Sequence, residues 1–283
     1  LFPDFRSRRR DEADLIDSEF LKCDRLFDIF FVLDESQSVG ITAFERAKDL
    51  IVSFIKKFEN RNSRVGVITY SNKAVVVHDL DYLTNSDKII EDIKKHKYEG
   101  SYTRTGNAMT TGIDLILKQK RPESEGISYK MFVITDGVAD DDVKVPAQRA
   151  RDNKIVVNAI GIGDAIKRSG LVDIAYDEAH IINFTNYEQL QCNVDRMIAE
   201  SCVQAKMIDL EVPVTSVLKP ENHDYFSFEL EKTEGLIVKI KKENTDLPMK
   251  IFASVHDPNP DSIAQEVKNS GLKTHEEVLT ISY

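Results

Sequence analysis

Short apolar runs alternate with amphipathic segments through most of this chain, and this alternation restricts the fold more than any other feature. The apolar runs are short enough for strands, and several suit burial on both faces; they span residues 27–33, 65–70, 74–78, 131–135 and 155–160. Apolar residues spaced by three and four positions predict helices at residues 43–58, 107–117, 146–152 and 187–199. Strands that alternate with helices predict an α/β fold with a doubly wound, mostly parallel sheet.

The predicted strands at residues 65–70 and 74–78 are joined too closely for a crossover helix. Only a few residues around Asn72 and Lys73 separate them. Parallel neighbours need a connection of about a dozen residues or more. We therefore expect this pair to be antiparallel and to lie at one edge of the sheet.

Side chains that carry oxygen cluster after two predicted strands and in the loop EGSYTRTGNAM before a predicted helix. They are Asp34, Ser36, Ser38, Thr103, Thr105 and Asp136. In an open α/β sheet, ligands bind beyond the carboxyl ends of the strands, so these side chains should meet at one rim. Carboxylate and hydroxyl oxygens without thiolate or imidazole favour a hard cation, for which Mg²⁺, Ca²⁺ and Mn²⁺ are the candidates.

Helix capping is the alternative explanation for each of these residues taken singly. Asp, Ser and Thr side chains satisfy exposed N–H groups where helices begin. The occurrence of all the positions together favours the metal interpretation. A cation held by so few carboxylates stays electrophilic, and it would accept an anionic oxygen from an Asp or Glu of a partner protein.

The same residues resemble the metal-ion-dependent adhesion site of von Willebrand factor type A domains, which are integrin I-like. The likeness rests on DESQS at residues 34–38, on Thr103 and on ITDG at residues 134–137. It extends over about residues 26–202 and includes DDVKVPAQRARDNKIVVNAIGIGD, which is similar to a stretch of matrilins and of collagen type A domains. The resemblance implies that the metal-site residues are Asp34, Ser36, Ser38, Thr103 and Asp136. Thr103 is preferred to Thr105 because the family threonine is the first of its Thr-x-Thr pair.

The resemblance also implies an extracellular adhesion or matrix module rather than an enzyme. Its cation, Mg²⁺ in the first place, would coordinate an acidic residue of collagen, another matrix protein or a cell-surface protein. Glu35 and Gln37 stand where the family has small residues, and with Tyr102 and Arg104 they would form the partner-binding rim. Two alternatives stay open: a metal-dependent hydrolase, for which Glu35 is the only candidate general base, and an intracellular assembly scaffold.

Beyond Cys202 the helical periodicity disappears, and short segments alternate apolar and polar residues. They lie at residues 208–218, 225–230, 236–241, 249–255 and 277–283. We therefore expect three regions: a leader at residues 1–25, the type A domain at 26–203, and a smaller, antiparallel β-sandwich-like domain at 206–283. Tyr283 ends inside an apparent strand, which indicates that the natural chain continues.

Three features predict a secreted or cell-surface location. A basic run at residues 6–10 resembles a processing site of secretory convertases, although an ordinary solvated tail explains it equally well. Cys23 and Cys202 bracket the type A segment, and we expect them to form a disulfide because the ends of a doubly wound domain lie close together. Cys192 would stay unpaired. Asn183 begins an Asn-Phe-Thr sequon for N-glycosylation.

The charge and the remaining motifs argue against other functions. A net charge of −10 disfavours nucleic-acid binding, which needs a basic face, and no uncharged stretch approaches the ~20 residues of a membrane span. Asp140, Asp141 and Asp142 should form a solvated acidic turn before a helix rather than a second calcium site. Gly161 and Gly163 lack the third glycine of a dinucleotide-binding loop, and the six histidines show no ligand spacing.

Overall fold

A computed structural model describes residues 26–186, apart from residues 59, 123–125 and 164–166. Beyond residue 186, it describes single positions up to Cys202 and four short strands. The chain divides into two compact units, of which the first comprises residues 1–121 and 127–202 and the second residues 122–126 and 203–283.

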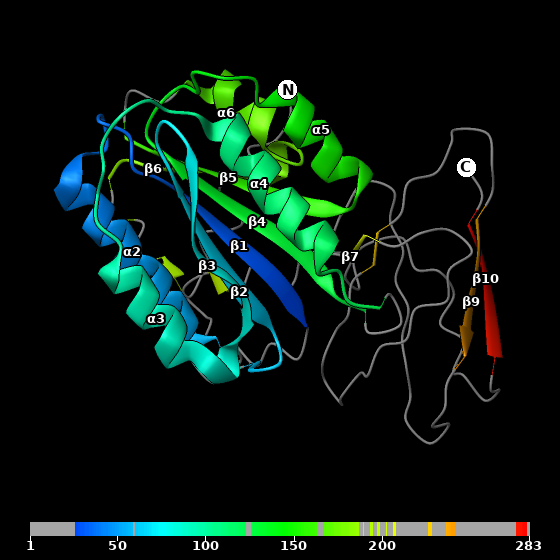
Figure 1. The fold of residues 1–283 in the computed structure, drawn as a ribbon. Helices are drawn as coiled ribbons and strands as arrows, with labels where there is room; N and C mark the ends of the chain where they lie inside the picture. The colour runs from blue at the N-terminus through cyan, green and yellow to red at the C-terminus, as the bar shows by residue number, and fades with distance from the viewer. Residues whose placement is uncertain are drawn as a thin grey trace. The chain divides into compact units, whose positions relative to one another are not determined.

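A six-stranded sheet forms the centre of the first unit. Its strands are β1 (Phe27–Asp34), β2 (Arg64–Tyr70), β3 (Ala74–Tyr82), β4 (Ser128–Thr135), β5 (Ile155–Ile162) and β6 (Ile181–Phe184). They lie in the order β3-β2-β1-β4-β5-β6, and every neighbouring pair is parallel except β2 and β3 (Figure 1). The predicted mostly parallel sheet with one antiparallel edge strand is therefore confirmed.

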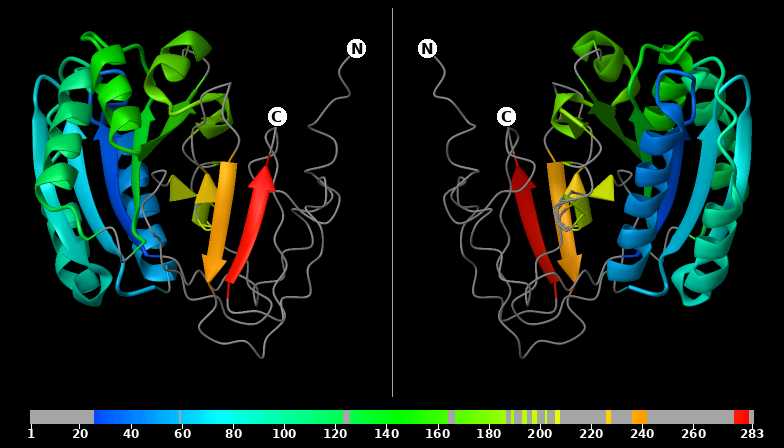
Figure 2. Two further views of the ribbon diagram at one scale, coloured as in Figure 1. Left: turned by 90° about the vertical axis from the view of Figure 1, so that its right-hand side faces the viewer. Right: turned by 90° about the vertical axis from the view of Figure 1, so that its left-hand side faces the viewer.

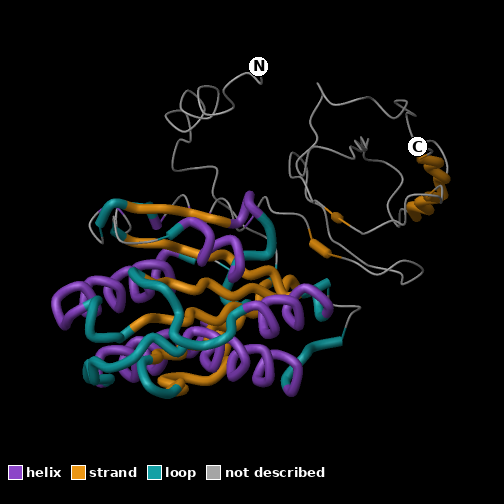
Figure 3. The backbone as a smooth tube through the Cα atoms, turned by 90° about the horizontal axis from the view of Figure 1, so that it is seen from above, coloured by secondary structure: helices purple, strands orange, loops and turns teal. Residues whose placement is uncertain are grey.

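Helices lie on both faces of this sheet (Figures 2 and 3). They are α2 (Gly40–Lys57), α3 (Ser86–Lys95), α4 (Thr105–Lys118), α5 (Lys144–Asp152) and α6 (Arg168–Ile174). Buried residues of α2 and α3 share one hydrophobic core with the sheet, and those of α4, α5 and α6 share another. The sheet thus has a separate core on each face, as expected for a doubly wound fold.

The central strand β1 supplies side chains to both cores. All eight of its residues are buried, and successive side chains point to opposite faces, so Phe31 packs with α2 while Phe30 belongs to the other core. The Phe31 ring meets Phe54 of α2 edge-on, with ring centres 5.1 Å apart. The predicted apolar stripe of α2 is therefore the face that covers β1.

The elements α3, α6 and β6 were not predicted. α3 buries only Ile89 and Ile93, which is too few apolar positions for a clear helical stripe, and β6 has four residues. The described residues of the first unit also include two single-turn 3-10 helices, Leu83–Asn85 and Glu178–His180. Short elements of this kind depend on packing against the larger ones, so a local pattern in the sequence identifies them poorly.

The described residues of the second unit form two pairs of strands. β9 (Leu236–Lys241) and β10 (Glu276–Ile281) are antiparallel, and both lie where strands were predicted. β7 (Lys206–Met207) and β8 (Phe226–Ser227) are parallel, which differs from the expected antiparallel arrangement. The connection between them is long enough for a crossover. The strands predicted at 208–218 and 249–255 lie outside the described residues, so the β-sandwich stays a prediction.

Candidate metal centre

β1 and β4 lie side by side where the sheet reverses its winding. The chain leaves β1 toward α2 on one face, and it leaves β4 toward α5 on the other. Loops that diverge in this way open a crevice at the carboxyl ends of the two strands, where α/β proteins bind ligands. Asp34 is the last residue of β1, and Asp136 directly follows β4. The topology therefore places both carboxylates at this crevice.

Hydrogen bonds join the predicted oxygen ligands from these two loops. Asp34 accepts at both carboxylate oxygens, Oδ1 from the Ser36 backbone N–H at 2.8 Å and Oδ2 from the Thr135 hydroxyl at 2.7 Å. The Ser38 hydroxyl donates to Asp136 Oδ1 at 2.9 Å, and the Ser36 and Ser38 hydroxyl oxygens lie 3.0 Å apart. Asp34, Ser36, Ser38 and Asp136 thus form one connected group, which we call the oxygen cluster.

Thr103, the fifth predicted ligand, lies on a loop that is attached to the same rim. The Gln37 N–H donates to the Ser101 carbonyl oxygen at 3.0 Å, and the Tyr98 hydroxyl donates to the Ser36 carbonyl oxygen at 2.9 Å. Within the described residues, the Thr103 hydroxyl makes no hydrogen bond to the oxygen cluster. Thr103 is therefore a neighbour of the cluster and not a member of its hydrogen-bonded network.

The acidic turn after β4 holds the Thr103 loop and the start of α4. Asp140 Oδ2 accepts the Thr103 N–H at 2.8 Å, and the Thr103 carbonyl oxygen accepts the Asp140 N–H at 2.9 Å. The Asp141 carboxylate accepts the N–H groups of Gly106 and Asn107, each at 2.8 Å, and so caps α4. The expected helix-capping role is thus present, but it serves a helix that precedes the turn in the chain.

Burial raises the pKa of both carboxylates in the oxygen cluster. Asp34 is fully buried, and its removal from water raises its pKa from 3.8 to about 6. Hydrogen bonds from Ser36 and Thr135 oppose this shift, and the charge of Asp136 adds to it. Burial also raises the pKa of Asp136, against a hydrogen bond from Ser38. Among the described residues, no Lys or Arg pairs with either carboxylate, so a cation would neutralise a charge that the chain leaves uncompensated.

The chemistry and the spacing of the oxygen cluster fit a small hard cation. Mg²⁺ binds oxygens in a nearly octahedral arrangement at about 2.1 Å, so neighbouring ligand oxygens lie about 3 Å apart. The Ser36–Ser38 and Ser38–Asp136 oxygen distances are 3.0 and 2.9 Å. In the described part of the chain, no three His, Cys, Asp or Glu side chains gather around one point where a metal would bind. A cation held at this rim would therefore have to use the serine hydroxyls as well as the carboxylates.

The partner-binding rim predicted from the sequence is only partly exposed. Its exposed members are Gln37, Tyr102 and Arg104. The prediction was wrong for Glu35, because the side chain of this residue is fully buried. Glu35 Oε2 lies 2.9 Å from His96 Nε2, which also lies 3.0 Å from the Thr69 hydroxyl. Glu35 is therefore unavailable as the exposed general base that the hydrolase hypothesis requires.

The predicted features of a secreted chain lie partly outside the described residues. Cys202 is disulfide-bonded, but Cys23 and Cys192 both lie outside those residues, so the Cys23–Cys202 pairing stays a prediction. The basic run at residues 6–10 lies outside them as well. Asn183 is exposed on the edge strand β6, and its glycosylation stays a prediction.

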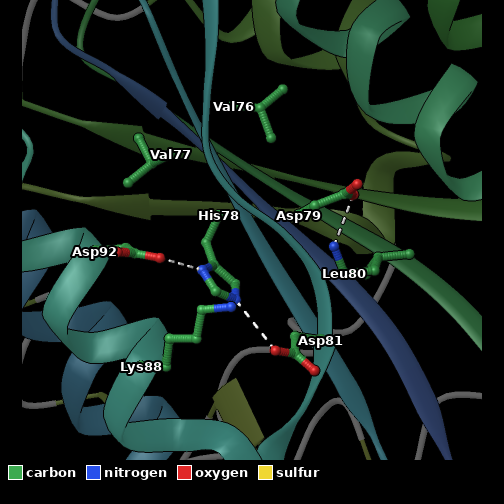
Figure 4. A pocket seen from close by; sticks show the side chains of 8 residues that line it. All are labelled: Val76, Val77, His78, Asp79, Leu80, Asp81, Lys88 and Asp92. Carbon is green, nitrogen blue, oxygen red and sulfur yellow. Dashed lines mark hydrogen bonds and ion pairs between the residues drawn. The ribbon is translucent and has the colours of Figure 1, made fainter.

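A separate hollow of about 380 Å³ lies beside the edge strand β3 and helix α3 (Figure 4). The buried His78 of β3 directs its Nδ1 to Asp92 Oδ2 of α3 at 2.7 Å, and its Nε2 lies 3.6 Å from Asp81 Oδ2. These contacts fasten α3 to the edge of the sheet. His78 therefore has a structural role, and the hollow does not belong to the rim with the oxygen cluster.

Comparison with known proteins identifies relatives of the first unit. The family model of the von Willebrand factor type A domain matches residues 28–196. The von Willebrand factor A domain-containing protein 2 of Xenopus laevis is 33% identical over 181 residues, which cover 63% of this chain and 23% of that protein. The human collagen alpha-1(XXI) chain is 34% identical over 150 residues, which cover 52% of this chain and 15% of that protein. The chain thus spans about a quarter or less of the length of these relatives.

Solved structures of a mussel protein share the fold. Proximal thread matrix protein 1 from the mussel byssus matches with a TM-score of 0.55 and 21% identity, over 65% of this chain and 51% of that chain. Another structure of the same mussel protein, with a zinc-occupied MIDAS motif, gives a TM-score of 0.55 and 19% identity, over 64% and 47% of the two chains. At this level of identity, the likeness shows the fold alone.

Proposed function

This chain belongs to the von Willebrand factor type A domain family, and from that premise we propose that it is a matrix or adhesion module that binds a protein partner through a divalent cation. The residues that would hold the cation are Asp34, Ser36, Ser38, Thr103 and Asp136. Mg²⁺ is the favoured ion, with Ca²⁺ and Mn²⁺ as alternatives. The observation that carries this proposal is the oxygen cluster at the switch point of the sheet, where the buried Asp34 carboxylate, the partly buried Asp136 carboxylate and two hydroxyls are linked.

The surroundings of the oxygen cluster favour an anionic ligand. When bound, a divalent cation supplies an electrophilic position for a carboxylate oxygen of the partner. Helix α2 begins two residues after Ser38; its first turn has no acidic residue, and its N-cap residue Val39 makes no side-chain capping bond. The free N–H groups of a helix N-terminus attract negative charge. The start of α4 is already capped by Asp141, so α2 is the helix that would favour the partner's carboxylate.

The similar proteins support an extracellular setting for this module. One of them, 34% identical over the matched residues, is a collagen chain. The proposed partners are collagen, another matrix protein or a cell-surface protein that presents an Asp or Glu. Among the described helices, none combines the length and the apolar character that a membrane span requires. We place the protein outside the cell or at its surface.

Metal titration of the whole chain by calorimetry tests the proposed site. Wild type should bind Mg²⁺ and Mn²⁺, whereas Asp136→Ala and Ser38→Ala should lose this binding without unfolding. Asp49→Ala, which removes an exposed carboxylate from α2, is the matched control and should bind like wild type. The second step is capture of immobilised collagen and other matrix proteins in Mg²⁺ and in chelator. Undiminished metal binding by folded Asp136→Ala would show that the cation does not bind at this rim.

A further inference from the structure

Large apolar side chains are exposed on the start of α2 and on the two loops that lie beside the oxygen cluster. Ile41 lies in the first turn of α2, three residues after Ser38, and it is 61% exposed. Tyr102 directly precedes Thr103 and is 62% exposed, and Val138 follows Asp136 by two positions and is 51% exposed. We call Ile41, Tyr102 and Val138 the apolar rim.

Contacts between the loops place the apolar rim around one point. The loop of Ile41 is joined to that of Tyr102 by the hydrogen bond from the Gln37 N–H to the Ser101 carbonyl oxygen at 3.0 Å. The loop of Tyr102 is joined to that of Val138 by the paired contacts of Thr103 with Asp140. The loop of Val138 returns to the first through the bond from Ser38 to Asp136 at 2.9 Å. The three residues of the apolar rim therefore lie on chain segments that are joined to one another around the oxygen cluster.

This exposure is concentrated at the rim. Seven large apolar side chains in the described residues are well exposed, and three of them lie on the segments beside the oxygen cluster. Exposed apolar residues that are scattered singly need no explanation, whereas exposed apolar residues that gather in one place commonly mark a binding surface. Interfaces commonly have an apolar core from which charged residues are depleted.

We propose that the apolar rim makes this module select partners whose acidic residue is flanked by bulky apolar side chains. The inference rests on the proposed function, because the cation and the open end of α2 would hold the partner's carboxylate at the centre. Neighbours of that acid would then lie over Ile41, Tyr102 and Val138. Leu or Phe at those positions buries apolar surface against these side chains, whereas Lys or Ser gains little from this burial and loses hydration where it meets them.

Peptides displayed densely on beads test this selectivity with the whole chain. The probes present one Glu between two Phe-Leu pairs, between Ser residues or between Lys residues, and a fourth carries Gln between the Phe-Leu pairs. In Mg²⁺, we expect the apolar-flanked Glu peptide to bind about tenfold more tightly than the Ser-flanked one, which corresponds to about 1.4 kcal/mol. The Gln peptide and all probes in chelator should capture little protein.

Variants then assign the preference to the apolar rim. The triple variant Ile41→Ser, Tyr102→Ser, Val138→Ser should bring the affinities for the apolar- and Ser-flanked peptides to near equality while its Mg²⁺ affinity stays unchanged. The matched control is Val76→Ser with Val172→Ser, which changes exposed valines on β3 and α6 and should keep the tenfold preference.

The outcomes separate this inference from the proposed function. Equal Mg²⁺-dependent capture of all three Glu peptides, or a preference for the Lys-flanked one, would overturn the role of the apolar rim and leave metal-dependent acid recognition intact. Capture that persists in chelator, or that does not distinguish Glu from Gln, would contradict both proposals.

Discussion

The two ends of β1 each carry a fully buried aspartate, Asp28 and Asp34, and the chain treats them differently. Asp28 accepts hydrogen bonds from two guanidinium groups, at 3.0 Å from Arg64 Nε and at 2.7 Å from Arg121 Nη2. Asp34 accepts hydrogen bonds from Ser36 and from the Thr135 hydroxyl, which are uncharged donors, and burial raises its pKa to about 6. One end of the strand is thus neutralised by the protein itself, whereas the other keeps a buried charge that an external cation would compensate.

Arg64 and Arg121, the two arginines that pair with Asp28, make further contacts at the start of β1. Arg121 Nη1 donates to the Asn62 carbonyl oxygen at 3.2 Å, and Arg64 Nη2 donates to the Gln119 carbonyl oxygen at 2.7 Å. Both guanidinium groups also lie about 6 Å from the Tyr82 ring, at 6.0 and 5.9 Å. This network joins β1, β2 and the end of α4, and it leaves no polar centre for a ligand. We therefore assign it a structural role.

The largest change in folding stability is expected from a substitution at Asp28. Asp28→Asn would leave two poorly exposed guanidinium groups without their anion, and it should lower the free energy of unfolding by about 3 to 5 kcal/mol. Urea denaturation in chelator measures this. A loss of less than about 1 kcal/mol in the free energy of unfolding would mean that Arg64 and Arg121 do not depend on the Asp28 carboxylate as their partner.

The same substitution at Asp34 should raise, rather than lower, the free energy of unfolding of the metal-free protein. Asp34→Asn removes a buried carboxylate whose pKa is raised from 3.8 to about 6, so the free energy of unfolding at pH 7 in chelator should rise by up to about 3 kcal/mol. In excess Mg²⁺, wild type should gain stability, and the variant should not. If Asp34→Asn destabilises the metal-free chain as much as Asp28→Asn does, the comparison between the two ends fails.

The raised pKa of Asp34 should also make the free energy of unfolding depend on pH. The folded-state pKa of Asp34 is above its unfolded value, so the folded chain takes up the proton first, and the cost of burying the charge disappears as pH falls from about 6 toward 4. In chelator, wild type should therefore gain stability relative to Asp34→Asn by up to about 1.4 kcal/mol per pH unit in this window. Mg²⁺ affinity should weaken over the same range, because the ion and the proton compete for the carboxylate. A stability difference that does not vary with pH would contradict this assignment.

The smallest change in folding stability is expected from a substitution in the acidic turn that caps α4. Asp141→Ala removes the acceptor for two helix N–H groups and should cost about 1 to 2 kcal/mol of stability. Asp142→Ala is the control, because Asp142 accepts only the nearby Lys144 N–H at 2.9 Å. Urea denaturation of both variants gives the comparison. If Asp141→Ala and Asp142→Ala lower the free energy of unfolding equally, the cap on α4 does not account for the effect of Asp141.

Sequence patterns predicted the features that depend on neighbours in the chain. The apolar run of β1 and the stripe of α2 identified the buried elements, and their alternation predicted the parallel sheet. Because parallel strands end at one rim, the positions of Asp34 and Asp136 after β1 and β4 placed them together before any coordinate was known. The burial of Glu35 could also have been inferred, since the two-residue period of β1 places it on the same face as Phe31 and Leu33.

Only the tertiary structure decided which distant groups meet. Asp28 finds its cations on Arg64 and Arg121, which lie 36 and 93 residues away along the chain. Asp141 caps a helix that begins 36 positions earlier, a partnership that no local rule predicts, because a carboxylate can accept from any N–H or guanidinium group that the fold brings near it. Local periodicity determines which face of an element is buried, since it follows from backbone geometry. The choice of polar partners depends on distances through space, which is why the same residue type, on one strand, is neutralised by the chain at Asp28 and left open to an ion at Asp34.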